Sequence, residues 1–150
     1  MPADRRNHEA GFTLIEVLAV LAILALAIGL LASRGPPRSP AFDARGTANQ
    51  VARSLRLARS QAIAANRDVA FTLDVANRNF RIGDGPWQTI PPTVDITVTA
   101  VAADAGSSAR IVFAPDGGST GGRVRVAGGA AALVVLVDWL SGRVTVANGA

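Results

Sequence analysis

The stretch from Phe12 to Ala32 constrains this chain more than any other, because every residue in it except Thr13 and Glu16 is apolar or Gly. About 20 such residues in a helix, at a rise of about 1.5 Å each, span a bilayer core of roughly 30 Å. Ala and Leu dominate the stretch and it contains no Pro, so helix propensity agrees with hydropathy. The sequence therefore predicts a transmembrane helix over residues 12–34 that carries one carboxylate near its start.

The flanks of the apolar stretch indicate its orientation. Arg5 and Arg6 precede it and favour a cytoplasmic N-terminus, although Arg34 follows it and weakens the bias. A removable Sec signal would need small residues at a cleavage site after the apolar stretch, and Leu31-Ala32-Ser33 lacks the first of them. We expect a single-pass protein with a cytoplasmic N-terminus.

Glu16 is the unusual residue of the predicted membrane helix. A carboxylate at the centre of a bilayer costs about 2.5–3.5 kcal/mol on insertion scales. Two interpretations stay open: the side chain reaches water near the interface, or it has a cationic partner. A cut between Gly11 and Phe12 would supply such a partner, namely the new α-amino group of Phe12.

Length and composition limit the remaining possibilities. A chain of 150 residues suggests one domain beside the helix. It has no Cys, which excludes disulfides and thiolate metal sites. All 15 basic residues are Arg, and against 11 acids they give a formal charge of +4, a weaker excess than dedicated nucleic-acid binders show.

A Pro-rich segment, residues 35–42, separates the membrane helix from a second predicted helix over residues 43–66. Proline removes a donor and clashes inside a helix, so we expect a linker or kink there. Apolar residues then recur at three- and four-residue spacing, with Asp43 as the expected N-cap. The stripe consists of Ala44, Ala48, Val51, Leu55, Ala58 and Ala62, with Ile63 beside it, whereas Arg45, Arg53, Arg56 and Arg59 lie off it and are expected to face solvent.

From Asp68 the apolar period changes to two, which is typical of half-buried strands. We expect a β-rich region over residues 68–147, arranged as an antiparallel meander, with the apolar run Leu133–Val137 in a central strand and a hairpin closed by Asp138–Gly142. Residues 102–108 are expected to form a loop. The fold class is thus α+β: a transmembrane helix, then a head over residues 43–150 in which an antiparallel β-rich region packs on the second helix.

The segment Gly11-Phe-Thr-Leu-Ile-Glu-Val-Leu18 resembles the leader junction of type IV pilins and type II secretion pseudopilins. The resemblance implies that residues 1–11 are a leader peptide, that a prepilin peptidase cuts after Gly11, and that the new terminus Phe12 is methylated to N-methylphenylalanine. It also implies that Glu16 is the carboxylate that supports filament assembly. The implied fold is the pilin fold.

Later segments resemble the H-type minor pseudopilins of type II secretion systems. They are Leu55–Ile63 with Val69–Phe71, the Gly-rich segment Phe113–Val126, and Val135–Val144. The resemblance implies a structural subunit of a periplasmic pseudopilus that works in protein secretion. It also implies that the protein lies in the bacterial inner membrane with its head in the periplasm. Its implied partners are the prepilin peptidase, other major and minor pseudopilins and an inner-membrane secretion platform.

The same domain family contains a relative of type IV pili that binds DNA in natural transformation, and this is the alternative function. Its C-terminal region carries a Gly-Arg-x-Arg pattern, whereas this chain has Thr145 where the second Arg would stand. If Arg110, Arg123, Arg125 and Arg143 gathered on one edge, they would form a site for anions or DNA. Binding would require several phosphate contacts and fall steeply with salt. We expect nucleic acid to be an unlikely partner.

The sequence contains no constellation typical of an enzyme. Gly117–Gly122 lacks the Lys of a P-loop and precedes a strand, so we interpret it as a flexible connection. Asp116 and Asp138 are expected to be turn residues, and Trp139 a packing anchor for the last hairpin. The only His, His8, lies in the predicted leader. We expect no cofactor, no metal and no catalytic residue.

Overall fold

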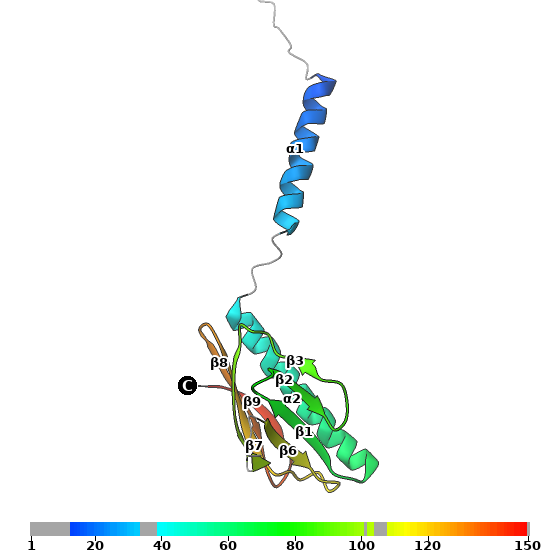
Figure 1. Ribbon diagram of the computed structural model, residues 1–150, viewed down its shortest axis with the longest axis vertical. Coiled ribbons are helices and arrows are strands. Elements are labelled where there is room, and N and C mark those ends of the chain that lie inside the picture. Colours follow the sequence, from blue (N-terminus) through cyan, green and yellow to red (C-terminus); the bar gives the residue numbers. More distant parts are fainter. Residues whose placement is uncertain (1–12, 34–38, 101, 104–107, 150) are drawn as a thin grey trace, which may run out of the picture. The chain divides into compact units, whose positions relative to one another are not determined.

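The computed structural model describes residues 13–33, 39–100, 102–103 and 108–149 (Figure 1). The chain divides into two units, Met1–Pro37 and Arg38–Ala150. The described part of the first unit is the helix α1 (Leu14–Ser33), which has 20 residues and lies within the predicted span 12–34. Taken over the residues that the structure describes, no helix reaches the length and hydropathy needed to cross a membrane.

The second unit begins with the helix α2 (Pro40–Ala65), 26 residues long. The prediction that Asp43 caps this helix is wrong: Ser39 is the N-cap and Pro40 occupies the first turn. Proline suits that turn because its missing N–H would have no partner there and its φ is already helical. The predicted linker 35–42 is therefore too long by the residues from Pro40 onward, while residues 34–38 lie outside the described part.

At its other end α2 stops at Asn66, which adopts a left-handed conformation with φ of 48°. Asn tolerates this conformation better than most residues, and it lets the backbone turn away while the last carbonyls keep partners. The N–H of Arg67 donates to the carbonyl of Ala62 at 3.3 Å. The chain can then enter its first strand only three residues later.

The described part of the chain after α2 contains nine strands, and all of their pairings are antiparallel (Figure 1). They are β1 (Val69–Asp74), β2 (Asn79–Ile82), β3 (Gln88–Thr89), β4 (Asp95–Ala100), β5 (Ala102–Ala103), β6 (Ser108–Phe113), β7 (Gly122–Gly128), β8 (Ala131–Val137) and β9 (Val144–Asn148). One sheet has the order β3-β2-β1-β6-β5 and the other the order β4-β7-β8-β9.

The two sheets correct the predicted meander. After β3 the chain leaves the first sheet to place β4 beside β7, and it returns to place β6 beside β1. The predicted loop 102–108 is also wrong in part, because β5 pairs with β6 and β6 begins at Ser108. The prediction for β8 is confirmed: it lies between β7 and β9, and the turn Asp138–Gly142 closes the last hairpin.

One core joins α2 to both sheets. The predicted stripe of α2 is buried from Ala44 to Ala62, whereas Ile63 remains exposed. Small side chains on that stripe let the sheets come close to α2. At the start of the helix β7 comes so close that a Cβ on Gly128 would overlap the carbonyl of Pro40. The largest fully buried side chains include Phe71, Phe80, Phe113, Leu55, Leu73, Ile90 and Ile111. Because both sheets pack on the same helix, α2 supports the whole head.

Trp139 is not the packing anchor that the sequence predicts. Its side chain is 66% exposed, and its neighbour Leu140 is 70% exposed. Both follow β8 in the hairpin turn, beyond the last inward-facing residue, Val137. The turn is held by backbone and short polar groups instead, since the N–H of Gly142 donates to the carbonyl of Asp138 at 2.9 Å.

Candidate functional site

The first turn of α1 contains Glu16, the carboxylate that the leader resemblance singles out. The N–H of Glu16 donates to the carbonyl of Thr13 at 3.1 Å and to the Thr13 hydroxyl at 3.3 Å. This is the Thr-x-x-Glu spacing of a capping box, in which the first side chain holds a free N–H of the helix terminus. Thr13 is thus a helix-starting residue that the sequence reasoning missed. Gly11 and Phe12 lie outside the described residues.

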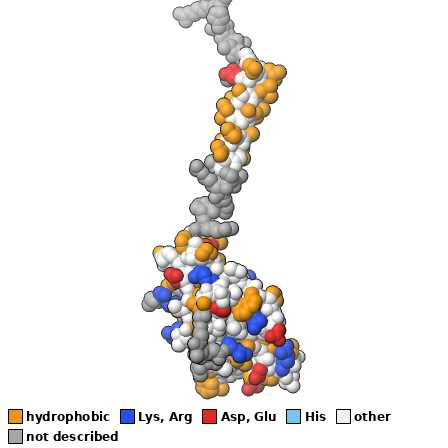
Figure 2. Space-filling model, viewed as in Figure 1, with side chains coloured by type: hydrophobic (Ala, Val, Ile, Leu, Met, Phe, Trp, Pro, Cys, Tyr) orange, Lys and Arg blue, Asp and Glu red, His pale blue; other side chains and the backbone are white. Residues whose placement is uncertain are grey.

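Figure 2 shows hydrophobic side chains along most of the visible face of α1, with one acidic side chain near the start of the helix. Its large side chains are well exposed within their own unit, from Leu14 at 79% to Leu30 at 60%. Monomeric soluble proteins rarely expose a continuous apolar surface of this extent, and such surfaces mark sites of protein or membrane interaction. Glu16 is therefore one carboxylate at the start of a long apolar contact surface.

The arginines considered for anion binding do not form one edge. Arg123 and Arg125 share the outer face of the second sheet, where they stand opposite Leu136 and Val134 of β8. Arg110 belongs to β6 of the other sheet, opposite Thr72. The structure thus brings two of these residues together and separates Arg110 from them.

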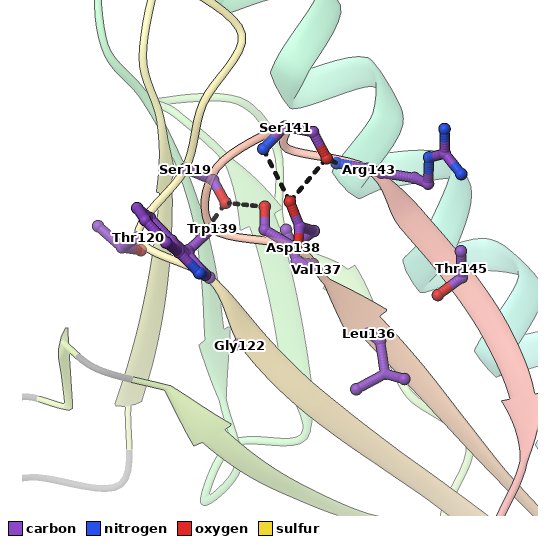
Figure 3. A pocket seen from close by; sticks show the side chains of 11 residues that line it. Ser119, Thr120, Gly122, Leu136, Val137, Asp138, Trp139, Ser141, Arg143 and Thr145 are labelled. Carbon is purple, nitrogen blue, oxygen red and sulfur yellow. Dashed lines mark hydrogen bonds between the residues drawn. The ribbon is translucent and has the colours of Figure 1, made fainter.

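Arg143 precedes β9 at the end of the hairpin and lines a groove of about 880 Å³ with Trp139, Gly121 and Leu136 (Figure 3). In Figure 3 the side chain of Asp138 turns toward Ser141, and that of Arg143 extends away from them. Asp138 Oδ1 accepts hydrogen bonds from the Ser141 N–H at 2.8 Å and the Ser141 hydroxyl at 2.7 Å.

The surroundings of Asp138 favour the ionised form of its carboxyl group. The hydrogen bonds from Ser141, together with the nearby charge of Arg143, lower the pKa of Asp138 below its ordinary value. Its carboxylate is therefore committed to the turn, as predicted for a turn residue. Asp116 has the corresponding role before β7, where its Oδ1 accepts from the N–H of Gly118 at 2.8 Å.

The Gly-rich segment 117–122 is not a flexible connection. The N–H of Ser119 donates to the carbonyl of Trp139 at 2.9 Å, and the N–H of Thr120 donates to the carbonyl of Val112 at 2.9 Å. The Ser119 hydroxyl also donates to the carbonyl of Asp138 at 3.1 Å. This segment and the β8–β9 turn therefore form one hydrogen-bonded unit at the end of the second sheet.

Two arginines of α2, Arg56 and Arg59, donate hydrogen bonds that join the helix to these turns. Arg59 Nε donates to the carbonyl of Gly117 at 3.0 Å, and Arg56 Nη2 donates to the carbonyl of Val144 at 3.2 Å. Arg45, Arg53 and Arg56 are exposed as predicted, whereas Arg59 is half-buried. Helical periodicity alone does not single out Arg59, because all four residues lie off the apolar stripe.

Within the described ranges there is no group of three or more His, Asp or Glu residues that could hold a metal ion. The features on which a function can be based are therefore the apolar surface of α1 with Glu16, and the turns and arginines at the far end of the head.

Two sequence families match this chain. The family described as "Type II transport protein GspH" matches residues 47–142. The one described as "Prokaryotic N-terminal methylation motif" matches residues 6–32. Together they confirm the resemblance seen in the leader junction and in the later segments.

Individual relatives agree with the family matches. The chain is 30% identical over 141 residues to the type II secretion system protein H of Xanthomonas campestris pv. campestris, covering 93% of this chain and 83% of that protein. The minor pseudopilin EpsH of Vibrio cholerae has a similar fold, with a TM-score of 0.57 at 15% identity over 75% of this chain and 99% of EpsH. The type IV minor pilin FimU of Pseudomonas aeruginosa also has this fold, with a TM-score of 0.54 at 13% identity over 69% of this chain and 91% of FimU.

The α+β, pilin-like fold expected from the sequence is thus confirmed. The matched region 47–142 contains most of α2 and the strands through β8, including the turns held by Arg59. On this evidence the chain belongs to the GspH family of type II transport proteins.

Proposed function

We propose that this chain, a minor pseudopilin of the GspH family, is anchored in the inner membrane by residues 12–34 and joins a periplasmic pseudopilus through that helix. The observation that carries the proposal is the pair of family matches, which place a methylation motif at residues 6–32 and the GspH domain at residues 47–142. The exposed apolar surface of α1 supports it, because that surface needs lipid or neighbouring helices around it. The role is structural, in association with other pseudopilins.

Processing would convert the membrane-held precursor into the assembling form. A prepilin peptidase would cut after Gly11, and Phe12 would become the methylated N-terminus. Glu16 would then pair with the Phe12 amine of a neighbouring subunit. Taking such a pair out of water offsets much of its attraction, so the pair would fix the register of subunits more than it would add stability.

The capping geometry at Thr13 supplies a sharp test of this role. A capping box accepts Gln in place of Glu, so Glu16→Gln should keep the start of α1 intact while removing the charge. If Glu16 serves assembly, the variant is cut normally but fails to enter the pseudopilus and impairs secretion. If Glu16 serves only the helix terminus, Glu16→Gln behaves as wild type while Glu16→Ala does not.

Processing is tested in the same strains. Mass spectrometry of membrane-extracted wild-type protein should show an N-terminus at methylated Phe12, and Gly11→Val should stay at full length. Glu9→Ala is the matched control, since it removes a carboxylate that the cut would discard anyway. An intact Met1 in the wild-type protein would contradict the proposal.

The structure adds no support for the DNA-binding alternative. Arg110 lies in a different sheet from Arg123 and Arg125, and the position that would need a second arginine is Thr145. The similarity to FimU concerns the fold alone.

A further inference from the structure

Three arginines line one groove between the last turns of α2 and the β8–β9 turn. The groove has a volume of about 490 Å³, and Arg56, Arg59, Ile63, Gly142, Arg143 and Val144 are among its lining residues. We call it the arginine groove. None of the residues that line it carries a carboxylate.

Two of the guanidinium groups are held in place by backbone carbonyls. Arg56 donates to Val144 and Arg59 donates to Gly117, each through one nitrogen. A guanidinium has five N–H donors, so each keeps most of its donors for another acceptor. Because the backbone already fixes them, these side chains would lose little conformational entropy on binding a ligand.

Two glycines create the space for Arg59. Gly117 has φ of +87° and Gly142 has φ of +60°, a region that side chains other than glycine rarely adopt. A Cβ on Gly142 would lie 3.0 Å from Arg59 Nε, and a Cβ on Gly117 would lie 3.2 Å from Arg59 Nη2. The guanidinium of Arg59 is thus set between two turns that are shaped to admit it.

The charge of the groove is compensated only in part, because among the described residues the Asp138 carboxylate interacts electrostatically with Arg143. Asp138 and Asp116, which belong to the adjoining turns, accept hydrogen bonds from Ser141 and Gly118. No ion pair joins either of them to an arginine of the groove among the residues that the structure places. The groove therefore presents an excess of positive charge beside Ile63, an aliphatic side chain that is 48% exposed.

We propose that the arginine groove binds an acidic segment of a neighbouring pseudopilin head, with a Glu or Asp carboxylate received by Arg56, Arg59 and Arg143. The inference rests on the proposed function and names the chemistry of one partner surface. Guanidinium groups match carboxylates with paired N–H···O bonds, and Ile63 offers a surface for the methylene groups of a Glu side chain. A nucleic acid would instead need phosphate contacts spread along an extended strip, and Arg123 and Arg125 lie outside this groove.

The test uses the full-length protein in detergent and each of the other pseudopilins of the same secretion system, purified separately in the same detergent. Wild-type protein is expected to bind at least one of them, with an affinity that falls as salt is raised. Arg56→Gln and Arg143→Gln should each weaken that binding about tenfold or more, as expected for loss of a charge-assisted hydrogen-bonded pair. Arg45→Gln, which removes an exposed charge of α2 outside the groove, should leave the affinity unchanged.

Arg143→Gln should fold like the wild-type protein, because the Arg143 side chain makes no hydrogen bond within the described part of the chain. A loss of binding in this variant can therefore be assigned to the groove. A competition series identifies the ligand chemistry: a polyglutamate peptide should displace the bound pseudopilin, and a polyglutamine peptide of the same length should not. More effective displacement by duplex DNA or by phosphatidylglycerol added to the detergent micelles would overturn the inference in favour of a phosphate ligand.

Two further results would also overturn it: no pseudopilin bound by the wild-type protein, or equal losses in Arg45→Gln and Arg143→Gln. The second would mean that general charge attraction, and not the groove, drives binding. The proposed function is judged separately by cleavage after Gly11 and by secretion in the same strains. If a groove variant no longer binds polyglutamate but is still cut, assembles and supports normal secretion, the inference about the arginine groove is wrong and the proposed function stands.

Discussion

Arg59 Nε donates a hydrogen bond to the carbonyl oxygen of Gly117 at 3.0 Å, and this single contact joins the last third of α2 to the turn before β7. Gly142 of the β8–β9 turn packs on the same guanidinium. Three segments far apart in the sequence therefore meet at one side chain. Their meeting point is also the wall of the arginine groove, so the stability of the head and the shape of its binding surface depend on the same residue.

Replacing Arg59 with Ala should destabilise the head by about 1–2 kcal/mol, because a half-buried carbonyl loses a charged donor and the two turns lose a packing partner. Arg53→Ala is the control, since Arg53 is exposed and its Nε donates only to Asn49 of its own helix at 3.3 Å. Urea unfolding of both variants measures the difference. Equal free energies of unfolding would show that the Gly117 contact adds no stability.

Gly142→Ala should cost more than Gly83→Ala, although the two glycines have similar backbone angles of φ +60° and +52°. An alanine in this conformation loses about 1–2 kcal/mol from the backbone alone. At Gly142 the new Cβ would also run into the carbonyl of Gly117 and lie 3.0 Å from Arg59 Nε, whereas at Gly83 it meets nothing within 4 Å.

We expect the crowding at Gly142 to add about 1–3 kcal/mol to the backbone cost, as overpacking does elsewhere. Chemical denaturation measures the free energy of unfolding of both variants, and the difference between them separates the cost of crowding from the cost of backbone strain. A Gly142→Ala protein no less stable than Gly83→Ala would mean that the two turns move apart easily.

Trp139→Ala should change the free energy of unfolding by less than about 0.5 kcal/mol, because most of that side chain already contacts water. Phe80→Ala is the opposite case. Phe80 is fully buried, with its ring centroid 5.5 Å from that of Phe71, and its loss should cost about 3–5 kcal/mol. Thermal unfolding of the two variants tests the contrast, and a large loss in Trp139→Ala would restore the packing role that the sequence suggested.

The stability of the head should depend on acid pH partly through Asp138. Hydrogen bonds from Ser141 lower the pKa of this carboxyl in the folded state from 3.8, so folding favours its ionised form. The resulting stability is present above that ordinary pKa and is lost as the pH falls through the lower folded-state pKa. Asp138→Asn keeps an oxygen acceptor for Ser141 but cannot ionise.

The measurement is the unfolding midpoint of both proteins from neutral pH to below the ordinary pKa of Asp. The advantage of the wild-type protein over Asp138→Asn should shrink in the acid range. Asp95→Asn, which removes an exposed carboxylate of β4, gives the background effect of losing one negative charge. An advantage that stays constant across the series would contradict the role of the ionised turn.

The parts of the fold that could be predicted are those that periodicity encodes directly. Ala44, Val51 and Leu55 recur with the helical period and are all buried, and Val69, Phe71 and Leu73 alternate and face the core. Periodicity says which face of a strand is buried but not which strand lies beside it. The pairing of β1 with β6 therefore could not be predicted, because the chain between them contributes β4 to the other sheet. Two-residue strands such as β3 are too short to show any period.

The errors at the site have a common physical cause. Trp139 was expected inside because large aromatics usually are, but a residue in a tight turn follows the direction of its backbone. Arg59 was expected in water because it lies off the apolar stripe, and only the folded chain brings Gly117 to it. A signal did exist in the two glycines, Gly117 and Gly142, but their positive φ angles become visible only in the structure.

The pairing of β1 with β6 has a consequence for how the head is made. Until Ser108–Phe113 have been synthesised, one edge of Val69–Asp74 has no partner and its main-chain groups remain open to other chains. Contacts of such long sequence separation form slowly. The nascent head therefore passes through an interval in which it is prone to aggregate. An α2 that folds early would shorten that interval by covering the apolar face of β1.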